Sequence, residues 1–281
     1  MVPFVFSALL AAASPHPVCN AEVCPERQND FVWENDKFGM RAYGPGEYHK
    51  WSGWDVFNKS SDADVTCAYV MHNCGSCGNW HNTPYKGILD NYTMGPSRGV
   101  GAIAFWGDGE WKTYANWEKA RVIHVGDDYC EFELVYPAFA PPGKMTCHIT
   151  LKRGDRFFRC DVSFEHPERF GGDFRVGPGI DLEPKRSHKG DIVEETGLVS
   201  LFEDEKAGNG STMEAVFVAP GEKVEMMTDH MNCRVLAFSK TSFTYWAGAS
   251  WSKAGEISSA SEWHDAVRKF RSACSAGEIS D

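Results

Sequence analysis

Residues 145–164 read MTCHITLKRGDRFFRCDVSF and are the clearest guide to the class of fold. The odd positions of 145–151 are apolar or cysteine, and so are the even positions of 158–164. Alternation with a period of two is typical of a β-strand that buries one face. Because the Arg-Gly-Asp sequence at 153–155 supplies a turn between the two runs, the stretch predicts a β-hairpin.

The rest of the chain continues this pattern of short strands separated by turns. A second hairpin is predicted from 101–106 and 110–117, joined by a Gly-Asp-Gly turn, whereas the glycine-rich stretch 171–179 is expected to be a loop. Further strands are expected near residues 38–43, 65–71, 121–125, 130–136, 197–202, 213–219, 233–239 and 242–248.

A helical pattern is found near the end of the sequence. Trp263, Val267 and Phe270 fall on one face of a helix, and Ser259 and Glu262 have the spacing of a capping box just before it. Many short strands followed by one helix predict a mostly β protein, an antiparallel β-sandwich with a short C-terminal helix. Strands and helices do not alternate along the sequence, which argues against the α/β folds.

The composition is that of an ordinary globular protein, with 281 residues of which 42% are hydrophobic and 24% charged. We expect one catalytic domain at 31–281, preceded by an N-terminal segment at 14–30. The formal net charge of −11 argues against a nucleic-acid binder, because neutralising phosphates requires a basic surface. An acidic small substrate remains compatible, since a few converging cations can bind one carboxylate. The oligomeric state stays open.

Residues 1–13 read MVPFVFSALLAAA and are predicted to be a signal peptide. The apolar run ends in small residues that suit cleavage, and it is too short to span a bilayer. A buried N-terminal strand is the alternative, and no integral membrane segment is expected elsewhere. Ten cysteines also fit an oxidising compartment in which several could pair. We therefore expect export to the periplasm or the extracellular space.

The residue types best suited to chemistry are concentrated in 67–112. Titratable side chains alternate there with tryptophans, and aromatic platforms with a few polar groups suit sugars. The Cys74-Gly-Ser-Cys77 motif has a spacing that fits a structural zinc, with His72, His81 or Cys67 as further ligands. In an exported protein a lone motif of this kind is more often a disulfide or a structural thiol pair. We expect neither a cofactor nor a catalytic metal.

Residues 95–101 read GPSRGVG, a tight loop that presents Arg98 between backbone amides. Arginine can bind a carboxylate through two parallel hydrogen bonds, so the loop is a candidate anion site. The alternative is a structural turn that carries a solvated arginine.

Four stretches resemble family signatures: residues 32–45, the loop 95–101, the Gly-Ile-Asp at 179–181, and YWAGASWSKAG at 245–255. They resemble those of a bacterial family known as a domain of unknown function, which occurs in polysaccharide-utilisation gene clusters and includes the ulvan oligosaccharide dehydratase. The resemblance implies a galactose-mutarotase-like β-supersandwich. It also implies that water is removed from a non-reducing terminal uronic acid of an acidic oligosaccharide, which leaves a 4,5-unsaturated sugar.

An elimination of this kind requires a cation, a base and an acid. Arg98 is expected to neutralise the uronate carboxylate and so to stabilise the developing enolate. His81 is the candidate base for the C5 proton, and Tyr92 or Tyr85 is the candidate acid for the departing hydroxyl. Further substrate contacts are expected from Lys112, Trp106, Trp251 and Lys253.

Two other functions remain open at this point. A polysaccharide lyase uses the same proton abstraction but expels a glycosidic oxygen, so its residues would look the same. A non-catalytic carbohydrate-binding protein would need the aromatic platforms without the ionisable groups, and a wide separation of Arg98 from His81 would favour it.

Overall fold

The computed structural model describes residues 18–46, 53–107, 109–113, 116–137, 143–182, 190–205, 207–231 and 233–276. The predicted signal peptide at 1–13 lies outside the described residues. In these ranges, no helix combines the length and the apolar character needed to cross a membrane.

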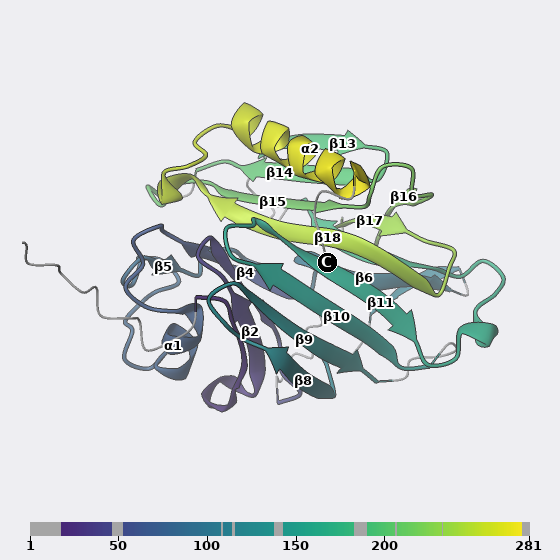
Figure 1. Ribbon diagram of the computed structural model, residues 1–281, viewed down its shortest axis with the longest axis horizontal. Helices are drawn as coiled ribbons and strands as arrows, with labels where there is room; N and C mark the ends of the chain where they lie inside the picture. Colours follow the sequence, from purple (N-terminus) through teal and green to yellow (C-terminus); the bar gives the residue numbers. More distant parts are fainter. Residues whose placement is uncertain are drawn as a thin grey trace, which may run out of the picture.

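The strands form three antiparallel sheets, which confirms the predicted mostly β sandwich (Figure 1). The large sheet has the order β13-β14-β15-β18-β11-β10-β9-β8, and the two smaller sheets have the orders β1-β2-β3-β4-β5 and β16-β17-β12-β6-β7. The strands of the large sheet are β8 (Lys119–His124), β9 (Tyr129–Tyr136), β10 (Met145–Lys152), β11 (Phe157–Phe164), β13 (Gly190–Glu195), β14 (Leu198–Glu203), β15 (Thr212–Phe217) and β18 (Ser242–Trp251).

The smaller sheets hold the remaining strands. The first contains β1 (Asn20–Cys24), β2 (Asp30–Glu34), β3 (Phe38–Ala42), β4 (Trp54–Lys59) and β5 (Ile88–Leu89). The second contains β6 (Val100–Gly107), β7 (Glu110–Thr113), β12 (Arg175–Asp181), β16 (Glu225–Thr228) and β17 (Cys233–Ala237). The helices are α1 (Cys67–His72) and α2 (Ala260–Ala276), with short 3₁₀ turns at Pro25–Arg27, Pro167–Arg169 and Ser252–Ala254.

The hairpin predicted at 145–164 forms as β10 and β11, in a register that pairs Met145 with Phe164. Its apolar positions face inward and are buried with residues of both smaller sheets, so one core lies between the large sheet and the other two. The opposite face of the large sheet carries α2, which packs Trp263 and Val267 on β14 and β15 (Figure 1). The predicted C-terminal helix is therefore confirmed.

The strand predicted at 65–71 is wrong, because this stretch forms the helix α1. The Thr66 side chain caps the helix by accepting from the amide of Tyr69. The buried carboxylate of Glu34 accepts hydrogen bonds from the amides of Cys67 and Ala68, at 2.9 and 3.1 Å. A contact from a distant strand thus satisfies the first amides of the helix, and the local residue pattern holds no sign of it.

The loop predicted at 171–179 is wrong in its second half, where β12 begins at Arg175. Glycines occupy this strand because their surroundings leave no room for a side chain. A Cβ on Gly177 would lie 1.9 Å from the Leu236 carbonyl oxygen, and one on Gly179 would lie 2.6 Å from Cγ of Arg98. Close backbone approach is a known reason for glycine inside a strand.

Candidate functional site

The interior of the sandwich changes from apolar to acidic at one end of the large sheet. On β14 the inward positions Val199 and Leu201 belong to the buried apolar set, whereas the next inward position is Glu203. On β15 the inward Val216 is followed, towards the same end, by Glu214. Both glutamates are buried, so two carboxylates lie inside the protein, away from water.

Tyr92 lies among these carboxylates and is only 5% exposed. Its hydroxyl makes no hydrogen bond to any residue in the described part of the chain. Burial raises the pKa of the phenol well above its ordinary value, and the carboxylates of Asp181, Glu214 and Glu203 raise it further. The phenol therefore stays protonated, and its proton has no acceptor among the described residues.

Arg98 reaches the same region from the 95–101 loop and is fully buried, so the alternative of a solvated arginine is wrong. Its Nε atom lies 3.1 Å from Oδ2 of Asp229, and its backbone amide donates to Sγ of Cys233. The other oxygen of Asp229 accepts from the amides of Met231 and Cys233, which fixes the carboxylate. The loop therefore holds a guanidinium inside the protein in a set orientation.

The GPSRG sequence at 95–99 has the spacing of a serine nucleophile elbow, but the structure gives it another role. The Ser97 hydroxyl donates to the Met94 carbonyl and accepts from the Gly99 amide, so it closes the loop. The loop leads into the strand β6, whereas a nucleophile elbow leads into a helix. Ser97 is thus a structural residue of the loop that carries Arg98.

A second buried polar cluster lies next to the first and is centred on Arg41. The guanidinium contacts Asp55 directly and lies 3.6 Å from Asp90 and 3.9 Å from Asp30. The Tyr43 hydroxyl donates to Asp55. Burial and the charge of Asp90 raise the pKa of Asp55 to about 6, against the opposite effect of Arg41. One cation thus faces three buried acids.

His81 adjoins this Arg41 cluster at the protein surface. Its Nδ1 lies 2.9 Å from Oδ2 of Asp90, its ring stacks on Trp80, and 48% of its side chain is exposed. The hydrogen bond to Asp90 raises the pKa of the imidazole. A base oriented by a buried carboxylate, with its second nitrogen accessible, is a common arrangement for proton abstraction.

The two clusters are joined by the segment Asp90–Tyr92 and by a chain of amides. Asn58 Nδ2 donates to the side-chain oxygen of Asn91 at 2.7 Å and to the Thr212 hydroxyl at 2.9 Å. Thr212 stands on β15 two residues before Glu214. The structure therefore groups Tyr92 and Arg98 with four buried acids: Asp181, Glu203, Glu214 and Asp229. The His81–Asp90 pair is connected to this group through hydrogen bonds but belongs to a separate cluster.

The remaining predicted site residues have other surroundings. The Tyr85 side chain hydrogen-bonds with those of Cys77 and Tyr69 and packs with the apolar group around α1. The Trp251 indole is buried and donates to the Asn209 carbonyl, in register with Thr212. The exposed Lys253 donates to the Gly208 carbonyl just beyond. Of these three, Trp251 lies closest to the acidic end of the interior.

Trp106 and Lys112 belong to the β6–β7 hairpin at the edge of the smaller sheet. Trp106 stands on the same face as Ala104 and packs edge-on against Trp111, on the side away from the sandwich core. Lys112 lies 3.6 Å from Glu110. The hairpin predicted from 101–106 and 110–117 is present, and its tryptophan faces away from Tyr92.

The sequence reasoning missed Asp181, Glu203, Glu214 and Asp229. A partial signal for two of them exists in the sequence, because Glu214 lies within the predicted strand 213–219 and Glu203 directly follows the predicted strand 197–202. An acid at such a position is costly to bury unless it has a function or a partner. Asp181 and Asp229 follow no alternation that would reveal them.

Metal ligands are not grouped in the part of the chain that the structure describes, where no set of three or more His, Cys, Asp or Glu is arranged to hold an ion. All ten cysteines are free thiols, Cys77 buried and Cys74 partly so. The expected disulfide at this motif is therefore absent, and the structural thiol pair is the alternative that agrees with the structure.

Comparison with known proteins gives a family and one curated relative. The model of a family described as a domain of unknown function (DUF4861) matches residues 8–276. A protein of Formosa agariphila named "Uncharacterized protein P7" is 25% identical over 273 residues, which cover 90% of this chain and 67% of that protein.

Solved structures show a weak likeness. The GH36 α-galactosidase AgaB from Geobacillus stearothermophilus aligns with 82% of this chain at 8% identity and a TM-score of 0.42. A variant of the GH36 α-galactosidase AgaA from the same species, in complex with raffinose, aligns with 76% at 9% identity and a TM-score of 0.37. This chain covers only 41% and 40% of those two chains. TM-scores this low do not establish a common fold.

Proposed function

Since the chain belongs to the DUF4861 family and encloses a protonated phenol among buried carboxylates, we propose that it is a carbohydrate-active dehydratase. Its substrate is an acidic oligosaccharide with a terminal uronic acid, and its product is the 4,5-unsaturated sugar. The motifs at 95–101 and 245–255, which resemble those of the family that includes the ulvan oligosaccharide dehydratase, support this substrate class. The apolar residues 1–13 support a place outside the cytoplasm.

Tyr92 is the proposed general acid, and the observation that carries the proposal is its buried hydroxyl without a partner among the described residues. Departure of the C4 hydroxyl requires a proton at the moment the C4–O bond breaks. A phenol held protonated by burial and by neighbouring carboxylates can supply that proton. The water that leaves takes the phenol proton, and Tyr92 regains one before the next turnover.

His81 is the proposed base, with Asp90 as its positioning residue. The imidazole takes the C5 proton, and the electrons of the C5–H bond form the C4=C5 double bond as the hydroxyl departs. The raised pKa makes His81 a stronger base, and it also means that the free imidazole becomes available only as the pH rises. Activity is therefore expected to increase with pH through that pKa.

Arg98 is proposed to offset the uronate carboxylate, whose charge spreads onto an enolate as the C5 proton leaves. Its orientation is fixed by Asp229, and its burial keeps water from weakening the electrostatic attraction. Glu203 and Glu214 can accept hydrogen bonds from sugar hydroxyls on the same inner surface. In this proposal Arg98 and Tyr92, from the acidic cluster, neutralise the carboxylate and donate the proton. His81, beside the Arg41 cluster, removes the C5 proton.

The direct test is incubation of the purified protein with oligosaccharides that carry terminal glucuronate or iduronate. We expect new ultraviolet absorbance from the unsaturated sugar, together with loss of one water and no change in chain length by mass spectrometry. New absorbance with shortened chains would instead identify a polysaccharide lyase. No change across the uronate panel would overturn the proposed elimination.

The Tyr92→Phe variant tests the acid, because it removes one oxygen and keeps the ring. We expect the turnover rate to fall about 100-fold or more, as is usual on loss of a general acid. The matched control is Tyr85→Phe, since that tyrosine contacts Cys77 and Tyr69 near α1. Equal turnover of wild type and Tyr92→Phe, or a comparable loss in Tyr85→Phe, would refute the assignment.

A further inference from the structure

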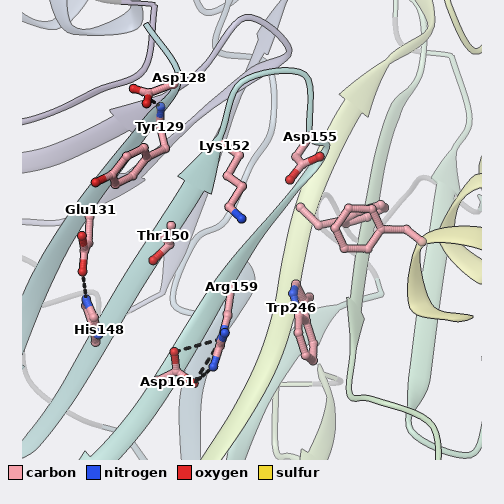
Figure 2. Close-up of a pocket in the computed structure, with 12 residues that line it drawn as sticks. Asp128, Tyr129, Glu131, His148, Thr150, Lys152, Asp155, Arg159, Asp161 and Trp246 are labelled. Carbon is pink, nitrogen blue, oxygen red and sulfur yellow. Dashed lines mark hydrogen bonds and ion pairs between the residues drawn. The ribbon is translucent and has the colours of Figure 1, made fainter. Parts of the chain in front are cut away.

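A cavity lies on the opposite face of the large sheet from the acidic interior. This outer pocket has a volume of about 670 Å³ and is lined by side chains of β9, β10, β11, β18 and α2, together with Asp128 and Asp155 beside them (Figure 2). In Figure 1 the strands that line it, β9, β10, β11 and β18, face the viewer below α2. Its volume falls in the range of small-molecule sites.

The outer pocket and the acidic interior are separated by the sheet itself. On β10 the side chains of Cys147, Ile149 and Leu151 enter the core, and those of His148 and Thr150 between them line the pocket. Successive residues of a strand point to opposite faces, so none of the pocket strands lends one side chain to both sites. The pocket is therefore a separate feature from the proposed active site.

Two aromatic rings of the outer pocket are held rigidly. Trp246 stacks on Phe217 with a centroid distance of 6.0 Å and an interplanar angle of 5°. Tyr129 stacks on His124 at 4.2 Å and 22°. Rings fixed in this way offer a flat apolar surface at little entropic cost, which suits the C–H faces of sugar rings.

The polar walls of the outer pocket are already paired among themselves. His148 Nε2 lies 2.7 Å from Glu131, Arg159 Nε lies 3.0 Å from Asp161, and the Thr244 hydroxyl donates to Asp161 at 2.5 Å. These groups keep lone pairs and N–H groups for hydroxyls of a ligand. Partial burial raises the pKa of Asp155 at one end of the pocket.

The charge of the outer pocket selects against anions. Its lining contains the four carboxylates of Asp128, Glu131, Asp155 and Asp161 and the two cations of Lys152 and Arg159. With His148 neutral, the formal net charge is −2, so a polyanion is repelled. A uronate carboxylate, as at the end of the proposed substrate, would meet the wrong sign of charge here.

The backbone of the outer pocket excludes a peptide added as a further strand. Each of β9, β10, β11 and β18 is hydrogen-bonded to a neighbour on both sides, so none offers a free edge. The four strands together extend for about 14 Å across the sheet, at roughly 4.8 Å between neighbours. That length exceeds one sugar ring and suits a short chain.

We propose that the outer pocket binds a neutral oligosaccharide, with Trp246 and Tyr129 as stacking platforms and the paired polar side chains as hydrogen-bond partners. An ordinary solvated sheet face would carry polar side chains too, but it would lack a cavity lined by fixed rings. The site would hold the protein on a neutral stretch of glycan while the interior acts on an acidic terminus. It does not depend on the proposed elimination.

The test is binding of the full chain to immobilised neutral oligosaccharides and to oligogalacturonates of matched length, followed by calorimetry with the strongest neutral binder. We expect binding to neutral chains and none, through this pocket, to oligogalacturonates. Trp246→Ala is expected to weaken neutral binding at least fivefold, and Trp106→Ala, on the far side of the other sheet, to leave it unchanged.

Tyr129→Ala is a second variant, because Trp246 also packs on Phe217 and its loss can disturb the fold. We expect a similar weakening from it, with an unchanged unfolding midpoint. The proposal is overturned if no neutral oligosaccharide binds, or if both pocket variants bind as well as wild type. The Tyr92→Phe variant should bind neutral chains normally, so failure of the elimination and failure of the pocket are distinguishable.

Discussion

Arg41 joins three aspartates that come from separate parts of the chain: Asp30 on β2, Asp55 on β4 and Asp90 after β5. All four side chains are buried. Removing the cation would leave three carboxyl groups close together, so their charges would repel or they would take up protons. The arginine is therefore needed for the fold of the first smaller sheet and for the position of Asp90 behind His81.

Replacement of Arg41 by methionine tests this role. Breaking a buried ion pair by removing one partner costs about 3–5 kcal/mol, and we expect the free energy of unfolding of Arg41→Met to fall by that amount in urea titration. The control is Arg121→Met, which removes the exposed pair with Glu133 and should cost at most about 1 kcal/mol. Equal stability of the two variants would contradict the assigned role.

The residue scale also shows why the site was only partly predictable. Tyr92 and Arg98 were predicted because a tyrosine and a glycine-flanked arginine are visible in the sequence. Their partners Asp181 and Asp229 are brought to them by β12 and by the turn before β17. No spacing within 67–112 could reveal acids that lie about 90 residues or more further along the chain.

At the scale of elements, the loop before β6 depends on two glycines with the same backbone angle. Gly95 and Gly99 both have φ of +56°, which side chains rarely adopt. A Cβ on Gly95 would meet nothing within 4 Å, whereas one on Gly99 would lie 1.9 Å from the Trp54 carbonyl oxygen. Gly99 therefore sets the contact between the loop and β4.

Alanine substitutions at Gly95 and Gly99 separate the cost of the positive φ angle from the cost of the close contact with Trp54. We expect Gly95→Ala to cost about 1–2 kcal/mol of unfolding free energy, from the backbone angle alone. Gly99→Ala should cost about 3 kcal/mol or more, because β4 and the loop must move apart and displace Arg98. Chemical denaturation of both variants is the measurement, and equal losses would show that the close contact does not matter.

The helix α2 is attached to β14 through a histidine that must stay neutral. One ring nitrogen of His264 lies 2.8 Å from the Ser200 hydroxyl, and burial lowers the pKa of the imidazole. In the unfolded chain the imidazole gains a proton near pH 6.5, while in the folded protein it stays neutral to a lower pH. The contribution of the neutral His264 to stability is therefore present above about pH 6.5. It is lost progressively as the pH falls from there towards the lowered pKa of the folded protein.

We therefore expect wild-type protein to lose more stability between pH 7 and pH 5 than His264→Gln, which cannot gain a proton. Intrinsic tryptophan fluorescence, to which the buried Trp263 of the same helix contributes, follows the unfolding. Unfolding curves at a series of pH values give the slope. An identical pH slope in both proteins would show that His264 is not the group responsible.

The secondary structure was predictable where one face of a strand is buried and the other is solvated. The β10–β11 hairpin has this pattern, and it forms where it was predicted. The strands β2 and β4 were not predicted. Every residue in them is buried, so alternation gives no signal there, although the equally buried β3 and β15 were predicted. Burial on both faces comes from packing between sheets, which the local sequence does not encode.

At the scale of the whole molecule, the class of fold follows from the number of alternating runs, whereas the arrangement of the three sheets does not. The large sheet places the last strand, β18, between β15 and β11. Its partner segment on β11 precedes it by about 80 residues. Pairings between strands so far apart in the sequence depend on the complete core. Local sequence patterns therefore predict where the strands are, but not which strands lie next to each other in a sheet.

The place of β18 determines when the protein can acquire its structure during synthesis. Until residues 242–251 have left the ribosome, the nascent chain holds two halves of a sheet with a gap between them. The missing strand carries Trp246 towards the outer pocket and Trp251 towards the acidic interior. Neither site can exist in a nascent chain that lacks β18, because a side chain of each arrives with that strand.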